Sequence, residues 1–181
     1  KFTAVNMLNA QYLKFGNQAN NVLQNDHAFG NAWFTENMIS VKNSDEELAA
    51  VCSLVSQKMT VMNAEKFKSS QSVYDAAATI ALETYQPNLL KYSVNNQNAG
   101  FAVFSEIYYP LGWQATVDGV PTEIKQVNYV LRGLEIPANS QEVVFEFKPA
   151  AYFIGNKITA AFSATVLLIL GFGLFKTITK K

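Results

Sequence analysis

The chain of 181 residues has few of the side chains that build disulfides and metal sites. It contains one cysteine, Cys52, and one histidine, His27. A single cysteine excludes an internal disulfide and any metal site made of several cysteines. His27 stands in a polar stretch with no second histidine, cysteine or paired carboxylate at the spacing that metal ligands need. We therefore expect no metal and no other cofactor.

Basic clusters and nucleotide-binding motifs are also missing. The 14 basic and 14 acidic residues balance to a net charge of zero, and Arg132 is the lone arginine. Phosphate backbones are bound by clustered lysines and arginines, so the composition excludes nucleic acid as a partner. The patterns GxGxxG, GxxxxGK[ST], GxSxG and HExxH do not occur. Dinucleotide-binding, P-loop, serine-hydrolase and zinc-protease functions therefore have no support.

A long uncharged run is present near the C-terminus. Residues Ile158 to Phe175 carry no ionisable side chain over 18 positions. As a helix this run covers about 27 Å, close to the thickness of the hydrocarbon layer of a bilayer. A core helix of a soluble protein this small is seldom surrounded by apolar groups on all sides. We predict a transmembrane helix at 154–177, with the lipid bilayer as a partner.

The flanking charges predict the orientation of this helix. Lys176, Lys180 and Lys181 follow the run, whereas Lys148 and Lys157 precede it. Cationic residues near a span tend to stay in the cytoplasm. We expect a cytoplasmic tail at 178–181 and an extracytoplasmic domain at 1–153, with Tyr152 and Phe153 as aromatic anchors at the interface. A chain that opens on Lys1 without an export signal reads as a fragment of a longer protein.

Short apolar segments with a period of two dominate the second half of the chain. They are separated by turn residues, and Asp118-Gly119 is the strongest hairpin signal because both positions tolerate a positive φ. Strands at this spacing predict a mainly β fold, an antiparallel sandwich. The expected strands cover 80–85, 90–94, 101–109, 113–117, 123–127, 129–136 and 143–147.

The first half is more mixed. We expect a strand at 6–15, a loop at 16–27 and extended chain at 34–41. Ser44 to Glu47 reads as a capping box at the start of a short helix, with Ser44 as the N-cap. Leu48, Val51, Cys52 and Val55 then form one apolar face, which makes Cys52 a small core residue rather than a nucleophile. The segment 59–74 is expected to pack at one end or edge of the sandwich.

The sequence resembles a known family of membrane proteins. FSEIYYPLGWQATVDGVPTEIKQVNYVLRGLEIP, which starts at Phe104, and the shorter pieces MLNAQY, FGNAW and YQPNLLKY are similar to the C-terminal region of YfhO-type bacterial membrane proteins. The resemblance implies a polytopic parent in the cytoplasmic membrane, similar to GT-C glycosyltransferases that use polyprenyl-phosphate sugars. It places the catalytic carboxylate upstream of Lys1. This region would then be a non-catalytic module whose partners are the other transmembrane helices and an envelope glycan.

Glu106 and Arg132 are the first pair of candidate ligand-binding residues. Glu106 interrupts an otherwise apolar strand, so its carboxylate needs a partner, and the guanidinium of Arg132 has the right geometry to engage both oxygens. A structural ion pair is the interpretation we favour. The functional alternative is a general acid or an anchor for a sugar hydroxyl, although a glycosidase would need a second carboxylate.

Tyr108, Tyr109 and Trp113 are the other candidates, on either side of the turn at 110–112. Aromatic rings beside a turn can stack on the C–H faces of a sugar, or they can form a corner of the core. Trp33 has the same two readings. An exposed cluster would favour a carbohydrate-binding module, and full burial of Trp33 and Trp113 would favour a structural cap.

Overall fold

The computed structural model describes the following residues: 12–14, 23–25, 29–54, 56, 58–71, 73–74 and 77–179. β1 (Tyr12–Lys14) pairs in antiparallel fashion with β2 (Leu23–Asn25). β1 falls inside the strand expected at 6–15, most of which lies outside the described residues. We expected a loop at 16–27, and this prediction is wrong in part, because Leu23–Asn25 forms a strand that pairs with β1.

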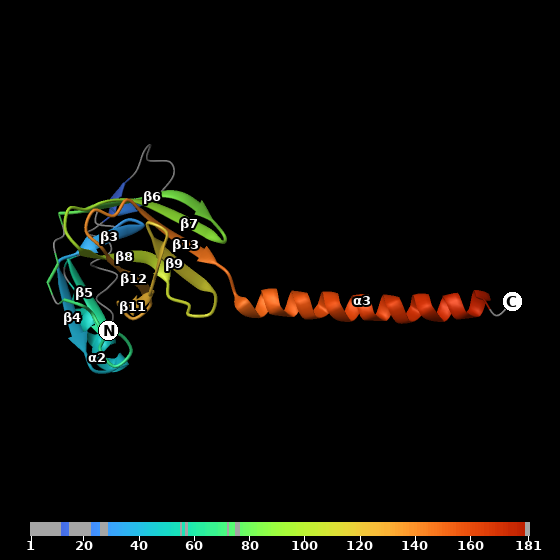
Figure 1. Cartoon of the computed structure of the whole chain (residues 1–181). Helices are drawn as coiled ribbons and strands as arrows, with labels where there is room; N and C mark the ends of the chain where they lie inside the picture. Colours follow the sequence, from blue (N-terminus) through green and yellow to red (C-terminus); the bar gives the residue numbers. More distant parts are fainter. Residues whose placement is uncertain are drawn as a thin grey trace.

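Two antiparallel sheets make up the body of the molecule (Figure 1). The five-stranded sheet has the order β10-β9-β13-β7-β6, and the four-stranded sheet has the order β11-β12-β8-β3. The bounds of the first sheet are β6 Thr79–Gln86, β7 Leu89–Asn95, β9 Trp113–Val117, β10 Val120–Thr122 and β13 Glu142–Phe147. Those of the second sheet are β3 Ala32–Thr35, β8 Gly100–Ile107, β11 Lys125–Val127 and β12 Leu131–Ile136. The predicted mainly antiparallel β fold is confirmed.

The main core lies between these two sheets. Tyr92 and Phe145 from the first sheet meet Phe104 from the second, with ring centres 4.8 to 6.1 Å apart and the rings edge to face. All three rings are fully buried. Edge-to-face pairs add to the stabilisation that comes from burying the apolar area. Face-to-face packing of two sheets over one apolar layer is the sandwich that the alternating pattern predicts.

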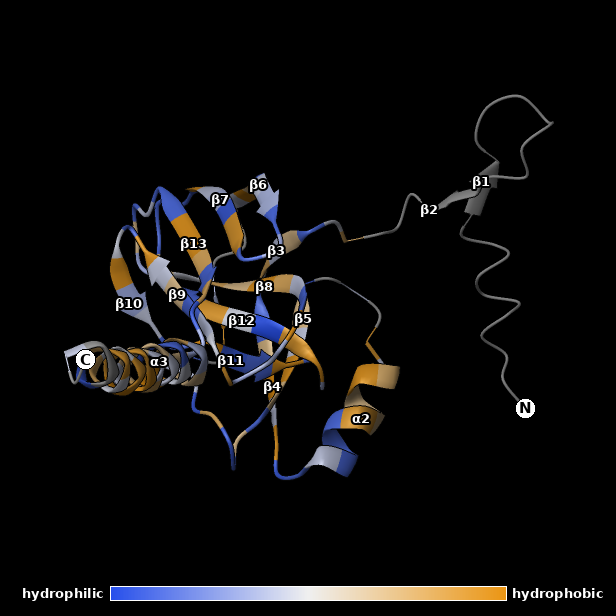
Figure 2. Cartoon of the chain, turned by 90° about the vertical axis from the view of Figure 1, so that its right-hand side faces the viewer, coloured by the Kyte–Doolittle hydropathy of each residue, from blue (hydrophilic) through white to orange (hydrophobic). Residues whose placement is uncertain are grey.

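A third, smaller layer covers the outer face of the four-stranded sheet (Figure 2). It consists of β4 (Asn37–Val41), α2 (Ser44–Cys52), β5 (Met59–Asn63) and the chain that follows. β4 and β5 run parallel, and α2 makes the crossover between them. Met62 and Tyr74 from this layer pack against Phe101 on β8. The segment 59–74 packs over a face of the sandwich rather than at the end or edge that we expected, and the parallel pair was not expected either.

Helix α2 corrects two of our predictions. Its N-cap is Asn43 rather than Ser44, because the Asn43 side chain accepts from the Glu46 backbone N–H and the Glu46 carboxylate accepts from the Lys42 N–H. The capping box therefore sits one residue earlier than expected. Leu48 and Cys52 are exposed, so the core role of Cys52 is wrong and Leu48 does not belong to a buried face. Val51 is half-buried, and Val55 lies outside the described residues. Because α2 lies at the edge of a small layer, little of its surface is covered, and Glu47 is its one buried residue.

The β9–β10 hairpin turns at the expected residues. Asp118 and Gly119 both have a positive φ, of 50° and 79°. The Asp118 carboxylate accepts from the backbone N–H groups of Gln141 and Glu142, which ties the turn to β13. The return strand differs from the single one expected at 123–127. It starts directly after the turn as β10 and then crosses to the other sheet as β11.

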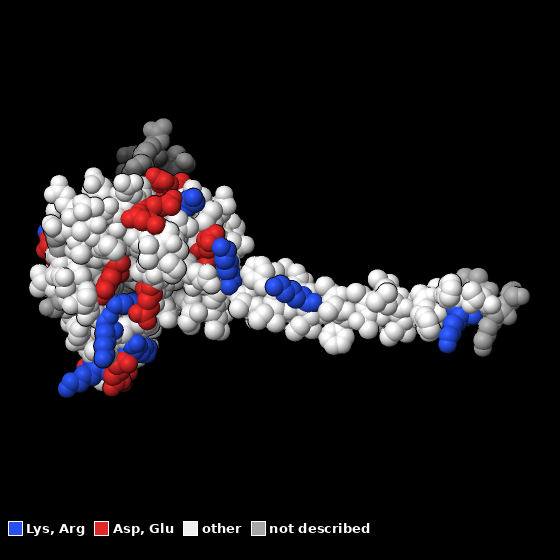
Figure 3. Space-filling model, viewed as in Figure 1, with Lys and Arg blue, Asp and Glu red and all other residues white. Residues whose placement is uncertain are grey.

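Helix α3 (Ala150–Thr179) extends away from the body (Figure 1). Residues Ala150–Lys176 are long and apolar enough to cross a membrane, and no part of this stretch is buried against the body. In the view of Figure 3, charged side chains appear on α3 only toward its two ends. In the described part of the chain, this is the one helix with the length and hydropathy of a span.

Candidate functional site

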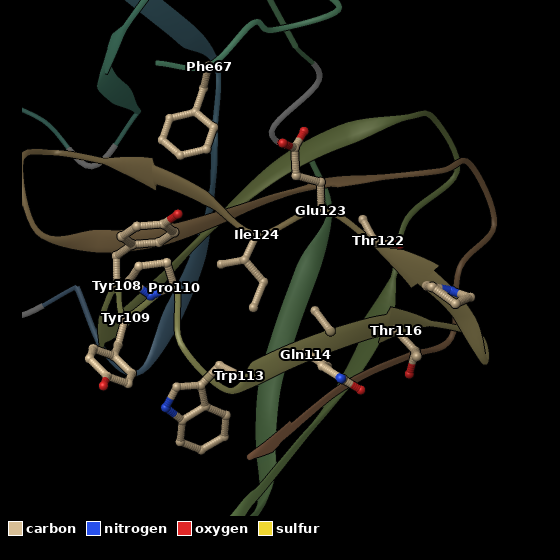
Figure 4. A pocket seen from close by; sticks show the side chains of 12 residues that line it. Phe67, Tyr108, Tyr109, Pro110, Trp113, Gln114, Thr116, Thr122, Glu123 and Ile124 are labelled. Carbon is tan, nitrogen blue, oxygen red and sulfur yellow. The ribbon is translucent and has the colours of Figure 1, made fainter. Parts of the chain in front are cut away.

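A groove opens between the chain segment that follows β8 and the β9–β10 hairpin (Figure 4). It has a volume of about 630 Å³, which is in the range of small-ligand sites. One wall is aromatic, the other is polar, and we call the whole the aromatic groove. Its lining residues are Phe67, Tyr108, Tyr109, Pro110, Trp113, Gln114, Ala115, Thr116, Pro121, Thr122, Glu123 and Ile124.

The aromatic wall contains three of the residues that the sequence predicted as ligand-binding candidates. Tyr108 and Tyr109 follow the end of β8, and Trp113 begins β9, so the turn at 110–112 brings the three rings to one side of the groove. Phe67 packs edge to face on Tyr108, with ring centres 5.7 Å apart. Tyr109 is half exposed, at 49%. The wall therefore presents ring surface to solvent, as a site that stacks on sugars requires.

The opposite wall supplies hydrogen-bonding groups. Gln114, Thr116 and Thr122 come from the two strands of the hairpin, and Glu123 follows β10. In Figure 4 the Ile124 side chain points into the space between Tyr108 and Trp113. Burial raises the pKa of the Tyr108 phenol, and the nearby Glu123 carboxylate raises it further. Tyr108 thus stays protonated and can donate a hydrogen bond.

Arg132 lies beneath Trp113 rather than in the groove lining. Its guanidinium carbon is 4.2 Å from the centre of the Trp113 ring and 5.4 Å from that of Phe145. Its Nε–H donates to the Ile107 carbonyl at 3.0 Å, while Nη1 is buried without a partner in the described structure. Burial lowers the pKa of the guanidinium. Cation–π stacking is therefore the main contact that holds this charge in place.

The structure contradicts the predicted ion pair between Glu106 and Arg132. The ion pairs formed within the described residues do not include it. A register shift between Leu131 and Arg132 pairs Arg132 with Phe104 and Leu131 with Ile107. Glu106 falls inside this irregularity and acts on Arg132 only at longer range, where it raises the guanidinium pKa. Glu106 is half-buried and does not line the aromatic groove.

Other sequence candidates lie away from the groove. Trp33 on β3 is buried between the four-stranded sheet and the outer layer, and it packs edge to face on Phe29. His27 lies outside the described residues. Across the described residues, no group of three His, Cys, Asp or Glu side chains is arranged to hold a metal ion. Sequence reasoning missed Phe67 and the polar wall from Gln114 to Glu123, because only the fold brings Phe67 to the hairpin.

The aromatic groove lies close to the start of α3. Tyr109, Pro110, Trp113 and Gln114 line it, and Pro110, Trp113 and Gln114 also line a neighbouring hollow with Lys148 to Ala151. The Lys148 N–H donates to the Gly112 carbonyl at 2.7 Å, which fixes the turn to the linker before the helix. A ligand in the groove would therefore sit beside the point where the chain enters α3.

The fold and the apolar helix together define a class of protein, a β-sandwich domain attached to a membrane helix. The family model described as bacterial membrane protein YfhO matches residues 50–159, which is more than half of the chain. The chain belongs to this family, as the sequence resemblance predicted, and it is a membrane protein. No curated protein and no solved structure matches it.

Proposed function

We propose that the chain is a non-catalytic, glycan-binding module of a larger YfhO-family protein in the bacterial cytoplasmic membrane. Residues 1–153 form its extracytoplasmic domain, 154–177 its last transmembrane helix and 178–181 a cytoplasmic tail. The parent protein transfers sugar from a polyprenyl-phosphate donor to an acceptor in the cell envelope. The aromatic groove holds that acceptor near the membrane, where the donor is anchored.

The observation that carries this proposal is the composition of the aromatic groove. Tyr108, Tyr109 and Trp113 offer ring faces for the apolar side of a sugar, and the facing wall offers hydroxyl, amide and carboxylate groups for its hydroxyls. Glu123 is the one carboxylate in the described lining, whereas glycoside hydrolysis uses a pair. This arrangement favours binding of a sugar over its cleavage.

A structural cap is the second candidate. The burial of Trp33 and the stacking of Trp113 on Arg132 favour it, because both tryptophans then contribute to packing. The two candidates differ at Tyr109, which is half exposed and has only a distant ring contact, with Phe147 at 6.5 Å. A cap has no use for this exposed ring, whereas a glycan site does.

Binding of envelope oligosaccharides to the purified chain in nanodiscs tests the proposal. We expect Tyr109→Ala to weaken binding at least tenfold, as loss of one stacking ring of about 1.4 kcal/mol would do. Tyr85→Ala is the matched control, because Tyr85 is 68% exposed and lies outside the groove. Equal binding by both variants, or no binding by the wild-type chain, would favour the structural cap.

A further inference from the structure

The turn beside the aromatic groove has an unusual surface for an exposed segment. Tyr109, Pro110 and Leu111 follow one another, and the Leu111 side chain is 68% exposed. We call residues 108–112 the membrane-side loop. Three successive apolar or aromatic residues at the tip of a loop are more than the scattered apolar positions that any soluble surface carries.

The position of this loop along the molecule is fixed by hydrogen bonds. The Tyr108 N–H donates to the Val130 carbonyl, and the Lys148 N–H donates to the Gly112 carbonyl, both at 2.7 Å. Leu111 lines one hollow together with Ala150 and Ala151. The tip of the loop is therefore level with the first turn of α3, on the side of the body from which the helix leaves (Figure 1).

The first turns of α3 indicate where the membrane surface lies. Tyr152 and Phe153 are both exposed, and aromatic residues of this kind collect at the boundary between headgroups and hydrocarbon. Ala150 and Ala151 precede them by less than one turn, a rise of about 3 to 5 Å. Leu111 lines a hollow with Ala150 and Ala151, so it lies beside this part of the helix.

We infer that the membrane-side loop inserts Leu111, at its tip, into the headgroup region of the same bilayer leaflet that α3 enters. The occupant of this apolar surface is thus lipid, and the contact is continuous with the lipid contact of α3. The nearby Lys148 is exposed but pairs with Glu146 at 2.5 Å, so the inferred contact depends on the apolar side chain. Two points of attachment would hold the body at a fixed tilt and keep the aromatic groove open along the membrane surface. This inference is independent of whether the groove binds a glycan.

Quenching of a fluorescent label by spin-labelled lipid headgroups tests the inference. The whole chain, with Cys52→Ser, carries one new cysteine labelled with an environment-sensitive dye and is reconstituted in vesicles of phosphatidylcholine and phosphatidylglycerol. We expect Leu111→Cys to be quenched severalfold more than Gln97→Cys, since Gln97 is exposed in the β7–β8 connection and is not part of the loop.

Two outcomes would overturn the inference. If the label at 111 is quenched no more than the label at 97, the loop stays in water. If Phe162→Cys, in the middle of α3, is not quenched by lipids labelled deep in the acyl chain, the helix itself does not enter the bilayer. Unchanged circular dichroism of each labelled chain ensures that the folded molecule is compared. A glycan-binding defect would change none of these readings.

Discussion

Arg132 shows how one side chain connects the core of the sandwich to the aromatic groove, because its guanidinium supports the Trp113 ring from below. The charge is 3% exposed and lacks a carboxylate within ion-pair distance in the described structure. Buried charges without such a partner are tolerated when aromatic faces and carbonyl groups solvate them. Removal of this residue should therefore affect both packing and the groove.

Substitutions at Arg132 and Glu106 separate stacking from ion pairing. We expect Arg132→Ala to lower the free energy of unfolding by about 2–4 kcal/mol, through the cavity and the lost Trp113 contact. Glu106→Gln should cost less than about 1 kcal/mol, as partly exposed charges at longer range contribute little. Urea unfolding of the two variants measures both values. Equal costs would mean that the two side chains do pair.

Gly112 occupies a position where a side chain does not fit. Its φ is +128°, and a Cβ there would approach the Phe147 ring to 2.7 Å. We expect Gly112→Ala to destabilise the chain by about 2–4 kcal/mol through strain and overpacking. Gly119→Ala is the control, because its φ of +79° is strained but its surroundings are open. Equal losses of thermal stability in the two variants would contradict the tight contact of Gly112 with Phe147 and Pro149.

Helix α2 is attached to the sandwich by one buried carboxylate. Glu47 is 1% exposed, and its Oε1 accepts from the Tyr129 N–H at 3.0 Å, where Tyr129 has a φ of 71°. Asn128, with a φ of 48°, exchanges hydrogen bonds with Val61 on β5. These contacts hold Asn128 and Tyr129 in the left-handed conformation, which is unfavourable for residues other than glycine. They therefore join the outer layer to the start of β12.

Hydrogen exchange at the Tyr129 amide tests this attachment. We expect Glu47→Ala to speed exchange there by at least tenfold, because the amide loses its acceptor, equivalent to about 1.4 kcal/mol. Glu47→Gln keeps an acceptor oxygen and should leave exchange nearly unchanged. Glu46→Ala removes only the exposed capping contact and is the matched control. Slow exchange in Glu47→Ala would mean that another group satisfies the amide.

The β9–β10 turn should respond to acid. Backbone N–H groups of Gln141 and Glu142 lower the pKa of the Asp118 carboxyl below its ordinary value of 3.8. The stabilisation that the ionised group provides is complete above pH 3.8 and is lost as the pH falls through the lower pKa of the folded state. We expect the difference in stability between the wild-type chain and Asp118→Asn to shrink as the pH falls below that value. Acid unfolding curves measure it, and a difference that is constant down to the folded pKa would contradict the two bonds.

At the level of elements, the sequence predicted the strands and turns that depend on interactions between residues close together in the chain. The period of two marked the strands, and Asp118-Gly119 marked the turn, because these depend on neighbours along the chain. The position of the α2 cap was missed by one residue, since Asn43 and Ser44 are both good caps and only the fold chooses between them. Cys52 was placed in the core because the helical pattern does not show that α2 lies at an edge.

At the level of the whole molecule, the membrane helix and the family were predictable, while the site was predictable only in part. The aromatic wall is encoded within six consecutive residues, so Tyr108, Tyr109 and Trp113 were found. Phe67 comes from another layer, and Glu123 follows a change of sheet that the alternation did not reveal. Glu106 and Arg132 were expected to pair because a carboxylate on an apolar strand needs a partner, but Glu106 falls within the register shift between β12 and β8 and forms no ion pair with Arg132.

The central claim is that the β-sandwich lies outside the cytoplasm while α3 crosses the membrane, and Cys52 provides the most direct test. This exposed thiol is on α2, in the outermost layer of the body. The natural gene product is expressed in bacterial cells, with any cysteine other than Cys52 replaced by serine. A membrane-impermeant maleimide should then label Cys52 in intact cells, and a cysteine at position 181 in the Cys52→Ser chain should react only after permeabilisation. Labelling of position 181 in intact cells, with Cys52 protected, would contradict the account.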